Sequence, residues 1–236
     1  MCGIIGIQNN KEAATLAYMG LYAQQHRGQE GAGVVSSDGK KLHRHMGQGL
    51  VSDVFSNPEV FDSLIGNSAI GHVRYSTTGD SDPKNVGPLT FNMGEYSLSI
   101  AHNGNLVNIE GIRKQLQEDG ALFQTSTDTE IIIHLLAREK GKTLAEKLGK
   151  VLQKIEGAYS LILLSPYEII AARDPHGIRP FCMGKLRNTI VFASETCALD
   201  LLGAEYVREV NPGEMIVAND DGFYSQFFTE PEEPKH

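Results

Sequence analysis

Short connections between strand-like segments restrict the fold of this chain more than any other feature of its sequence. Strands are expected at 2–7, 33–37, 41–46, 69–75, 96–102, 159–164, 169–173, 181–184, 189–193, 206–210 and 214–218. A parallel pair of strands needs a crossover of about a dozen residues or more, and most of these connections are too short for one. Asp38-Gly39 is typical of a hairpin turn between the second and third segments. The sequence therefore predicts an α+β fold with mainly antiparallel sheet rather than a doubly wound fold.

Helices are expected between groups of these strands. Apolar residues at helical spacing predict helices over 13–21, 109–116 and 195–202. Two further helices are expected to begin at capping boxes, in which a Thr and a Glu three residues later satisfy free backbone N–H groups. Thr127 with Glu130 would open a helix over 131–140, and Thr143 with Glu146 would open one over 144–155.

Length and composition indicate one globular domain. The chain has 236 residues, of which 41% are hydrophobic, and this suffices for a core. We expect residues 1–230 to form the domain and residues 231–236 to be a solvated tail or the start of a linker. A formal net charge of −8 argues against nucleic acid or an anionic membrane as a partner. No apolar run is long enough to cross a bilayer and no export signal is visible, so we expect a cytoplasmic protein, either a monomer or a homo-oligomer.

Cys2 differs from the other cysteines because it is one peptide bond from the start of the chain. If Met1 is removed, Cys2 carries a thiol and a free α-amine, which together form a nucleophile and its base. An α-amine titrates near about 7.7–8.0, so much of it can accept a proton at neutral pH. The alternative interpretation is that Cys2 only begins a buried strand as a small apolar residue.

Three polar clusters interrupt the strand-like segments. Arg74 lies near the end of segment 69–75, and its guanidinium suits a carboxylate held by two hydrogen bonds; a surface Arg or a structural ion pair is the alternative. Asn103 and Gly104 follow segment 96–102, where a turn could present N–H donors to an oxyanion; an ordinary Asn-Gly turn is the alternative. Asp128 would lie in the first turn of a helix, where the helix dipole already stabilises it, and it could also hold an ammonium group.

Together these groups predict a site for a free amino acid with a side-chain amide. Arg74 and Asp128 would bind its carboxylate and its ammonium group. Asn103 and Gly104 would stabilise the negative charge that develops when Cys2 attacks the amide carbon. The substrate that fits this description is glutamine or, less well, asparagine.

Four other reactive residues, two cysteines and two histidines, are interpreted as structural. Cys182 and Cys197 lie among apolar residues and are expected to be packing residues. His72 and His102 adjoin the site residues, but the expected chemistry requires no imidazole. Three cysteines at wide spacing match neither a disulfide framework nor a metal-binding pattern, so no metal and no cofactor is expected in this chain. A reducing compartment would keep Cys2 as a thiol.

The motifs that contain the site residues resemble those of the class II glutamine amidotransferases, a branch of the N-terminal nucleophile hydrolases. The matching segments are CGIIGI at 2–7, QHRGQE at 25–30, GLVSDVF at 49–55, GHVRYST at 71–77, HNGNLVN at 102–108, TSTDTE at 125–130 and RDPHGIRP at 173–180. They span nearly the whole chain in family order. QHRGQ, RYST and RDPHGIRP resemble the amidophosphoribosyltransferase branch rather than the glucosamine-6-phosphate synthase branch.

The resemblance implies a four-layer αββα sandwich of two mainly antiparallel sheets, which is the N-terminal nucleophile hydrolase fold. It implies that Cys2 is the nucleophile with its freed amine as the base, and that Asn103 and Gly104 form the oxyanion hole. It also implies that Arg74 and Asp128 hold the glutamine.

Two more residues are assigned by the resemblance alone. Thr77 and Arg27 lie in glutamine-site motifs of the family, so both are expected to bind substrate. The segment 74–88 would be a loop that closes over glutamine.

The resemblance further implies a partner for the reaction. Glutamine would be hydrolysed to glutamate and ammonia through a Cys thioester. The ammonia would pass to a phosphoribosyltransferase domain or subunit in the first step of purine synthesis. No phosphoribosyl-binding motif is found in this sequence, so we expect that acceptor site to lie outside it. The alternatives are a glutaminase domain of the glucosamine-6-phosphate synthase type, a hydrolase for another amide, and a non-catalytic domain that senses glutamine.

Overall fold

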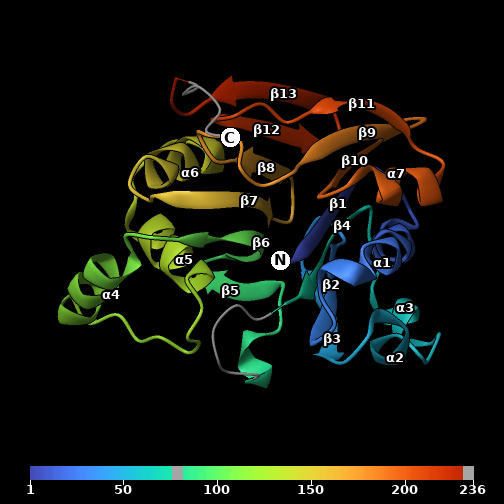
Figure 1. Cartoon of the computed structure of the whole chain (residues 1–236), viewed down its shortest axis with the longest axis horizontal. Helices are drawn as coiled ribbons and strands as arrows, with labels where there is room; N and C mark the ends of the chain where they lie inside the picture. Colours follow the sequence, from blue (N-terminus) through green and yellow to red (C-terminus); the bar gives the residue numbers. More distant parts are fainter. Residues whose placement is uncertain (76–81, 231–236) are drawn as a thin grey trace.

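Two antiparallel sheets form the centre of the fold (Figure 1). The structure is a computed structural model and describes residues 1–75 and 82–230. In spatial order, the seven-stranded sheet contains β11 (Glu205–Glu209), β9 (Cys182–Leu186), β10 (Thr189–Ala193), β1 (Gly3–Gln8), β4 (Ser68–Arg74), β2 (Gly31–Ser37) and β3 (Leu42–Gln48). The six-stranded sheet contains β13 (Gly222–Phe227), β12 (Glu214–Asn219), β8 (Ile169–Arg173), β7 (Gly157–Leu164), β6 (Tyr96–Leu106) and β5 (Leu89–Met93). Every pairing between the described strands is antiparallel, which confirms the predicted α+β class.

Helices cover the outer face of each sheet, so the order of layers is helix, sheet, sheet, helix. The seven-stranded sheet is covered by α1 (Ala13–Ala23), α2 (Val51–Val54), α3 (Val60–Ser63) and α7 (Thr196–Leu202). The six-stranded sheet is covered by α4 (Ile109–Glu118), α5 (Thr129–Arg138) and α6 (Leu144–Leu152). Two short 3-10 helices, η1 (Gln25–Arg27) and η2 (Pro83–Asn85), lie in connections. This arrangement confirms the four-layer sandwich implied by the family resemblance.

The apolar run at the start of the chain is explained by these layers. Successive residues of a strand point to opposite faces of the sheet. Ile4 therefore packs in the cluster between the two sheets, while Ile5 packs in the cluster under α1. Because both faces of β1 are buried, both sets of side chains are apolar, and the segment reads as a continuous apolar run rather than an alternating one.

Most of the predicted strands and helices are confirmed, but two local predictions are wrong. The capping box of Thr127 and Glu130 does not form, because α5 begins at Thr129 and the Glu130 carboxylate accepts the N–H groups of Gln124 and Thr125. The strand expected over 96–102 continues to 106, so no turn follows it. The other capping box does form at its Thr, since Thr143 Oγ1 accepts the N–H of residue 146 at 3.1 Å.

The sequence patterns missed two edge strands. β5 and β13 each form the edge of the six-stranded sheet, and most of their residues are exposed or half-buried. An edge strand with little buried surface lacks the alternation that identifies a strand in sequence. Residues 231–236, expected to be a tail or linker, lie outside the described residues. In the part of the chain that the structure describes, no helix is both long enough and apolar enough to cross a membrane.

Replacement of Ile162 by Ala should test the core between the two sheets. Ile162 is fully buried there, so the variant should lose about 2–5 kcal/mol of unfolding free energy from lost burial and the cavity left behind. Urea unfolding of the purified protein measures this. Ile65→Ala is the matched control, because Ile65 is 51% exposed and its replacement should change the unfolding free energy by about 0.5 kcal/mol or less. Equal losses in the two variants would contradict the assigned core.

Candidate active site

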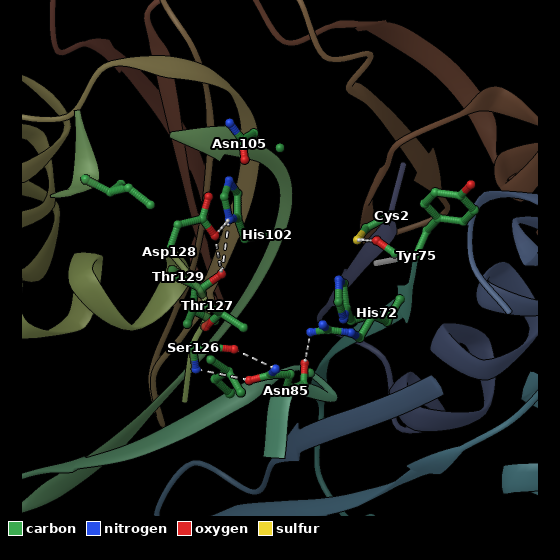
Figure 2. A pocket seen from close by; sticks show the side chains of 16 residues that line it. Cys2, His72, Tyr75, Asn85, His102, Asn105, Ser126, Thr127, Asp128 and Thr129 are labelled. Carbon is green, nitrogen blue, oxygen red and sulfur yellow. Dashed lines mark hydrogen bonds and ion pairs between the residues drawn. The ribbon is translucent and has the colours of Figure 1, made fainter. Parts of the chain in front are cut away.

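A cavity of about 150 Å³ opens where the start of β1 and the end of β4 face β6 and the start of α5 (Figure 2). Its lining residues are Cys2, His72, Arg74, Tyr75, Asn85, Gly87, Leu89, Ile100, His102, Gly104, Asn105, Ile109, Ser126, Thr127, Asp128 and Thr129. Pockets for drug-sized ligands are larger, at about 300–1,000 Å³, so this one suits a ligand of amino-acid size. Four of the predicted site residues, Cys2, Arg74, Gly104 and Asp128, line it together.

Cys2 is placed at the cavity by strand β1. This strand pairs with β4 on one side and with β10 on the other. The Cys2 Sγ lies 3.7 Å from the carbonyl oxygen of Tyr75, the residue that follows β4. Figure 2 shows Cys2 and Tyr75 on one side of the cavity, with His102 and Asp128 on the other. The thiol therefore faces the polar groups contributed by the second sheet.

Arg27 holds the backbone at Cys2 and does not line the cavity. Its Nε donates to the Cys2 carbonyl oxygen at 2.9 Å, and its Nη1 donates to the carboxylate of Glu195. Arg27 is only 5% exposed, so its charge needs this partner. Burial tends to raise the pKa of Glu195, but hydrogen bonds from Arg27 and His26 outweigh it and the pKa is lowered. Arg27 thus positions Cys2 in this structure, and its direct contact with substrate stays a prediction.

Glycine at position 28 lets the chain after η1 lie directly against the end of β4. A Cβ at Gly28 would lie 2.6 Å from the carbonyl carbon and oxygen of Arg74, which is closer than real Cβ atoms approach. Arg74 then reaches the cavity with its side chain 13% exposed. Its Nη1 donates to the Asn85 carbonyl oxygen at 2.6 Å, and its Nε lies 3.9 Å from the Glu30 carboxylate.

Asp128 is the N-cap residue of α5, and groups of β6 fix its carboxylate. Oδ2 accepts the N–H of Leu106 at 3.0 Å, and Oδ1 lies 3.4 Å from His102 Nδ1. Burial tends to raise the pKa of Asp128, but His102 and the hydrogen bond from Leu106 outweigh it and the pKa is lowered. Asp128 therefore remains ionised at neutral pH and presents a fixed negative charge to the cavity.

Gly104 directs its N–H toward the cavity without a turn. Tyr159 of β7 lies opposite Gly104, and both backbone groups of Tyr159 form hydrogen bonds with Asp174. The Tyr159 N–H donates to the Asp174 carboxylate at 3.1 Å, and the Tyr159 carbonyl oxygen accepts the Asp174 N–H at 2.9 Å. The facing pair of Gly104 and Tyr159 is therefore the type without mutual hydrogen bonds, and Gly104 points its N–H away from β7. On that side β5 pairs with β6 from Tyr96 to Ile100, so position 104 lies beyond the end of β5.

A side chain could not occupy position 104. A Cβ there would lie 2.2 Å from the carbonyl oxygen of Ala158. The glycine is required by this close approach of β7, and not by the turn that the Asn-Gly pair suggested. The donor expected at this position is therefore present, for a different structural reason.

Of the predicted site residues that the structure describes, Asn103 does not line the cavity, and neither does Arg27. Asn103 is fully buried on the face of β6 toward the other sheet, where its Nδ2 donates to Ser160 Oγ at 3.4 Å. Among the described residues its Oδ1 has no hydrogen-bond partner. Thr77 lies outside the described residues, as do residues 76–81 of the segment expected to close over substrate. The oxyanion role of Asn103 and the substrate role of Thr77 stay predictions.

Sequence reasoning missed a connection across the cavity between Asn85 and Ser126. The Asn85 Nδ2 donates to Ser126 Oγ at 2.9 Å, and its Oδ1 accepts the Ser126 N–H at 3.3 Å (Figure 2). Asn85 also accepts from Arg74 through its carbonyl oxygen, so one residue joins the β4 side of the cavity to the loop before α5. Nothing local in the sequence connects positions 85 and 126. His102, interpreted as structural, also lines the cavity and contacts Asp128.

Comparisons with known proteins identify the family of this chain. Residues 72–201 match the family model described as glutamine amidotransferase domain. The amidophosphoribosyltransferase of Bacillus subtilis is 47% identical over 97% of this chain and 48% of its own length. The chloroplastic amidophosphoribosyltransferase 2 of Arabidopsis thaliana is 48% identical over 99% of this chain and 42% of its own length.

A solved structure is also similar. The glutamine phosphoribosylpyrophosphate amidotransferase from B. subtilis, complexed with ADP and GMP, matches with a TM-score of 0.91 and 47% identity. The match covers 97% of this chain and 49% of that chain. The present chain thus spans about half the length of the relatives it matches.

Replacement of His72 by Gln should change how stability depends on pH. Burial lowers the pKa of His72 to about 3, and the charges of Arg74 and His102 add to this effect. Between its usual pKa of 6.5 and this value, the unfolded chain binds a proton that the folded chain does not, so stability falls as the pH falls. His72→Gln removes this proton uptake. Below the usual pKa, the parent should lose up to about 1.4 kcal/mol more per pH unit than the variant.

Urea unfolding of both proteins at about pH 7, 6 and 5 measures this difference. The carboxylates with lowered pKa values are common to both proteins and cancel in the comparison. Parallel pH dependences for parent and variant would show that His72 is not held neutral.

Proposed function

Because the chain belongs to the family of class II glutamine amidotransferase domains, we propose that it hydrolyses L-glutamine to glutamate and ammonia through a thioester at Cys2. The observation that carries the proposal is the convergence of Cys2, Arg74, Gly104 and Asp128 on one small cavity. These residues supply a nucleophile, a cation, a backbone donor and an anion. A free amino acid with a side-chain amide needs each of these groups.

The chemistry follows from the thiol and the amine of one residue. The Cys2 thiol gives its proton to the freed α-amine, and the sulfur attacks the side-chain amide carbon of glutamine. The Gly104 N–H stabilises the negative charge on the amide oxygen. The protonated amine gives its proton to the leaving nitrogen, and ammonia departs from the tetrahedral intermediate. Water, with the amine as base, then attacks the γ-glutamyl thioester, which releases glutamate and restores the thiol.

Removal of Met1 is a condition for this mechanism. While Met1 is attached, the Cys2 nitrogen is part of a peptide bond and cannot act as a base. Met1 is 53% exposed, so an aminopeptidase can reach it. Burial lowers the pKa of the Met1 amine, and the nearby Arg27 and Arg179 lower it further against the opposite effects of Cys2 and Glu30. An amine freed at Cys2 would lie one residue further along β1, next to the Arg27 that donates to the Cys2 carbonyl oxygen.

Arg74 and Asp128 would recognise the two charges of the amino acid. Arg74 comes from the end of β4 in one sheet, and Asp128 comes from the start of α5 on the other. The substrate carboxylate would pair with the Arg74 guanidinium and its ammonium group with Asp128. Because the two charges come from different layers, only a zwitterion of suitable length can contact both.

The ammonia acceptor is a second part of the proposal. The relatives described above are named amidophosphoribosyltransferases, which favours this reaction over a glucosamine-6-phosphate synthase type. We propose that ammonia from this domain serves a phosphoribosyltransferase domain or subunit in the first step of purine synthesis. A reducing compartment such as the cytoplasm suits the site, because Cys2 must remain a thiol.

Replacement of Cys2 by Ser should abolish glutamine hydrolysis. In protein whose mass shows that Met1 is absent, Cys2→Ser should reduce glutamate release by about a thousandfold or more, since the reaction loses its nucleophile. An electrophilic glutamine analogue should add one adduct to the parent, mapped to Cys2, and none to the variant. Cys182→Ala is the control and should still release glutamate, because Cys182 lies in the core and has no role in the proposed mechanism. Glutamine binding without glutamate release in the parent would instead identify a sensing domain.

Replacement of Asp128 by Asn should weaken glutamine binding more than it slows the chemistry. The loss of a charged hydrogen bond, worth about 1.5–3 kcal/mol, should raise the KM for glutamine by about 10- to 150-fold. Arg74→Ala should act in the same direction. Steady-state glutamate release measures both. Glu118→Gln is the control, because this exposed carboxylate pairs only with Lys114 on α4 among the contacts described. An unchanged KM in both site variants would favour a hydrolase for a different amide.

A further inference from the structure

His26, Glu195 and Cys197 form a cluster of potential metal ligands at the other end of the Arg27 guanidinium from Cys2. One imidazole nitrogen, one carboxylate oxygen and one sulfur lie within 4.8 Å of one another. The His26 Nε2 is 2.8 Å from Glu195 Oε2, and the Cys197 Sγ is 3.7 Å from the same oxygen. None of the three lines the glutamine cavity.

The donor set selects the class of ion. A nitrogen, an oxygen and a sulfur donor together suit Zn²⁺, whereas Mg²⁺ and Ca²⁺ prefer oxygen donors alone. Zn²⁺ holds such donors at about 2.0–2.3 Å, so two donors on one ion lie roughly 3.5 Å apart. The separations of 2.8 and 3.7 Å from Glu195 Oε2 lie near this value, and the third, between His26 and Cys197, is within 4.8 Å. Side-chain rotations of His26 and Cys197 would bring all three donors onto one ion.

The cluster is also open to an incoming ion. The His26 side chain is 57% exposed and can rotate toward a metal. A second cavity, of about 500 Å³, is lined by Glu195 and Cys197 together with Tyr206 and Glu209. This cavity gives solvent access to the carboxylate and the thiol, and it leaves room for water as the fourth ligand.

We propose that His26, Glu195 and Cys197 form a binding site for Zn²⁺, and that occupation of this site weakens the hold of Arg27 on Cys2. When the ion binds, the Cys197 thiol loses its proton to solvent and its sulfur bonds the metal. The neutral imidazole of His26 and the carboxylate of Glu195 donate electron pairs without loss of a proton. The hydrogen bond between His26 and Glu195 is replaced by their bonds to the metal.

The effect on Cys2 follows from the charge of Arg27. Glu195 is the anion that pairs with Arg27, and a cation bound to this carboxylate withdraws the negative charge from the pair. Arg27 is 5% exposed, so its guanidinium has little contact with water that could replace the lost partner. Its Nη2 already has no hydrogen-bond partner among the residues described. The guanidinium is therefore expected to shift, and the hydrogen bond from its Nε to the Cys2 carbonyl oxygen weakens with it.

Sequence spacing could not reveal this cluster. His26 lies in η1, whereas Glu195 and Cys197 lie at the start of α7, and the chain between them is most of the protein. The packing of α1 against α7 brings the two segments together, because η1 follows α1 and the Cys197 Sγ donates to the carbonyl oxygen of Ala23 at the end of α1 at 3.6 Å. Cys197 was interpreted as a packing residue, and the structure shows in addition that its sulfur lies 3.7 Å from the Glu195 carboxylate.

Metal binding can be tested apart from catalysis in a Cys2→Ser background, where the N-terminal thiol cannot bind the ion. Co²⁺ serves as a visible probe for Zn²⁺. We expect one Co²⁺ per chain, an absorption band for sulfur-to-metal charge transfer, and displacement of the Co²⁺ by Zn²⁺. Cys197→Ser should remove this band. His26→Gln should weaken Zn²⁺ binding by about tenfold or more. Replacement of a residue that only hydrogen-bonds to a metal ligand already lowers metal affinity by this factor.

Two controls decide the result. Cys182→Ala should retain the band, because Cys182 is buried and its Sγ donates to the Ala193 carbonyl oxygen. His26 is exposed, so His26→Gln should keep the far-ultraviolet circular dichroism and the melting temperature of the parent. A band that survives Cys197→Ser, or the absence of stoichiometric binding by folded protein, would overturn the site.

The coupling to Cys2, unlike the site itself, rests on the proposed function. If Zn²⁺ acted by binding to Cys2 itself, it would inhibit the parent and His26→Gln at the same concentration. Zn²⁺ that acts through the proposed site should need about a tenfold higher concentration for half-inhibition of glutamate release in His26→Gln. Equal half-inhibition in the two proteins would overturn the coupling. Absence of glutaminase activity in the parent would instead contradict the proposed function and leave the Co²⁺ result standing.

Discussion

The beginning of this chain is held in the middle of a sheet, and the site depends on that constraint. Chain termini usually fray unless they are tied down. Here β1 pairs with β4 and β10, the Ile4 N–H donates to Ser194 Oγ at 3.0 Å, and Arg27 donates to the Cys2 carbonyl oxygen at 2.9 Å. These bonds fix the backbone of the second residue, so the position of its thiol depends on the sheet and not on a loose end. The same bonds place a free amine, once formed, next to fixed charges.

Two carboxylates outside the cavity, the buried Asp174 and the partly exposed Glu195, act on the site through other residues. Asp174 takes both backbone groups of Tyr159, which leaves Gly104 opposite with its N–H turned outward. Glu195 pairs with the buried Arg27, which holds Cys2. Asp174 belongs to the RDPHGIRP motif, which the sequence alone connected with a family but not with a physical role. The structure supplies that role, because a change at Asp174 would alter the hydrogen bonding of β7 beside the cavity.

The sequence predicted what depends on local pattern and missed what depends on distant contacts. The buried strands, the amphipathic helices and the charged residues at strand ends follow from spacing and residue type, and most were found. The Asn-Gly pair at 103–104 is typical of a turn, but pairing with β7 keeps it in β6. The Thr127 capping box failed because the Glu130 carboxylate binds the N–H groups of the preceding loop. The link between Asn85 and Ser126 exists only once the two segments are packed, so no local pattern could indicate it.

The pairing of β1 with β10 has a consequence for the order of events at the ribosome. Ile5 faces Ala193, so β1 gains its second neighbour only when the segment up to β10 has emerged. Until then β1 can pair only with β4. The anchoring by Ser194 and Glu195 is still missing at that stage, so the nucleophile is not yet assembled. In the proposed mechanism, the topology therefore delays assembly of the nucleophile until the strands near the end of the domain are in place.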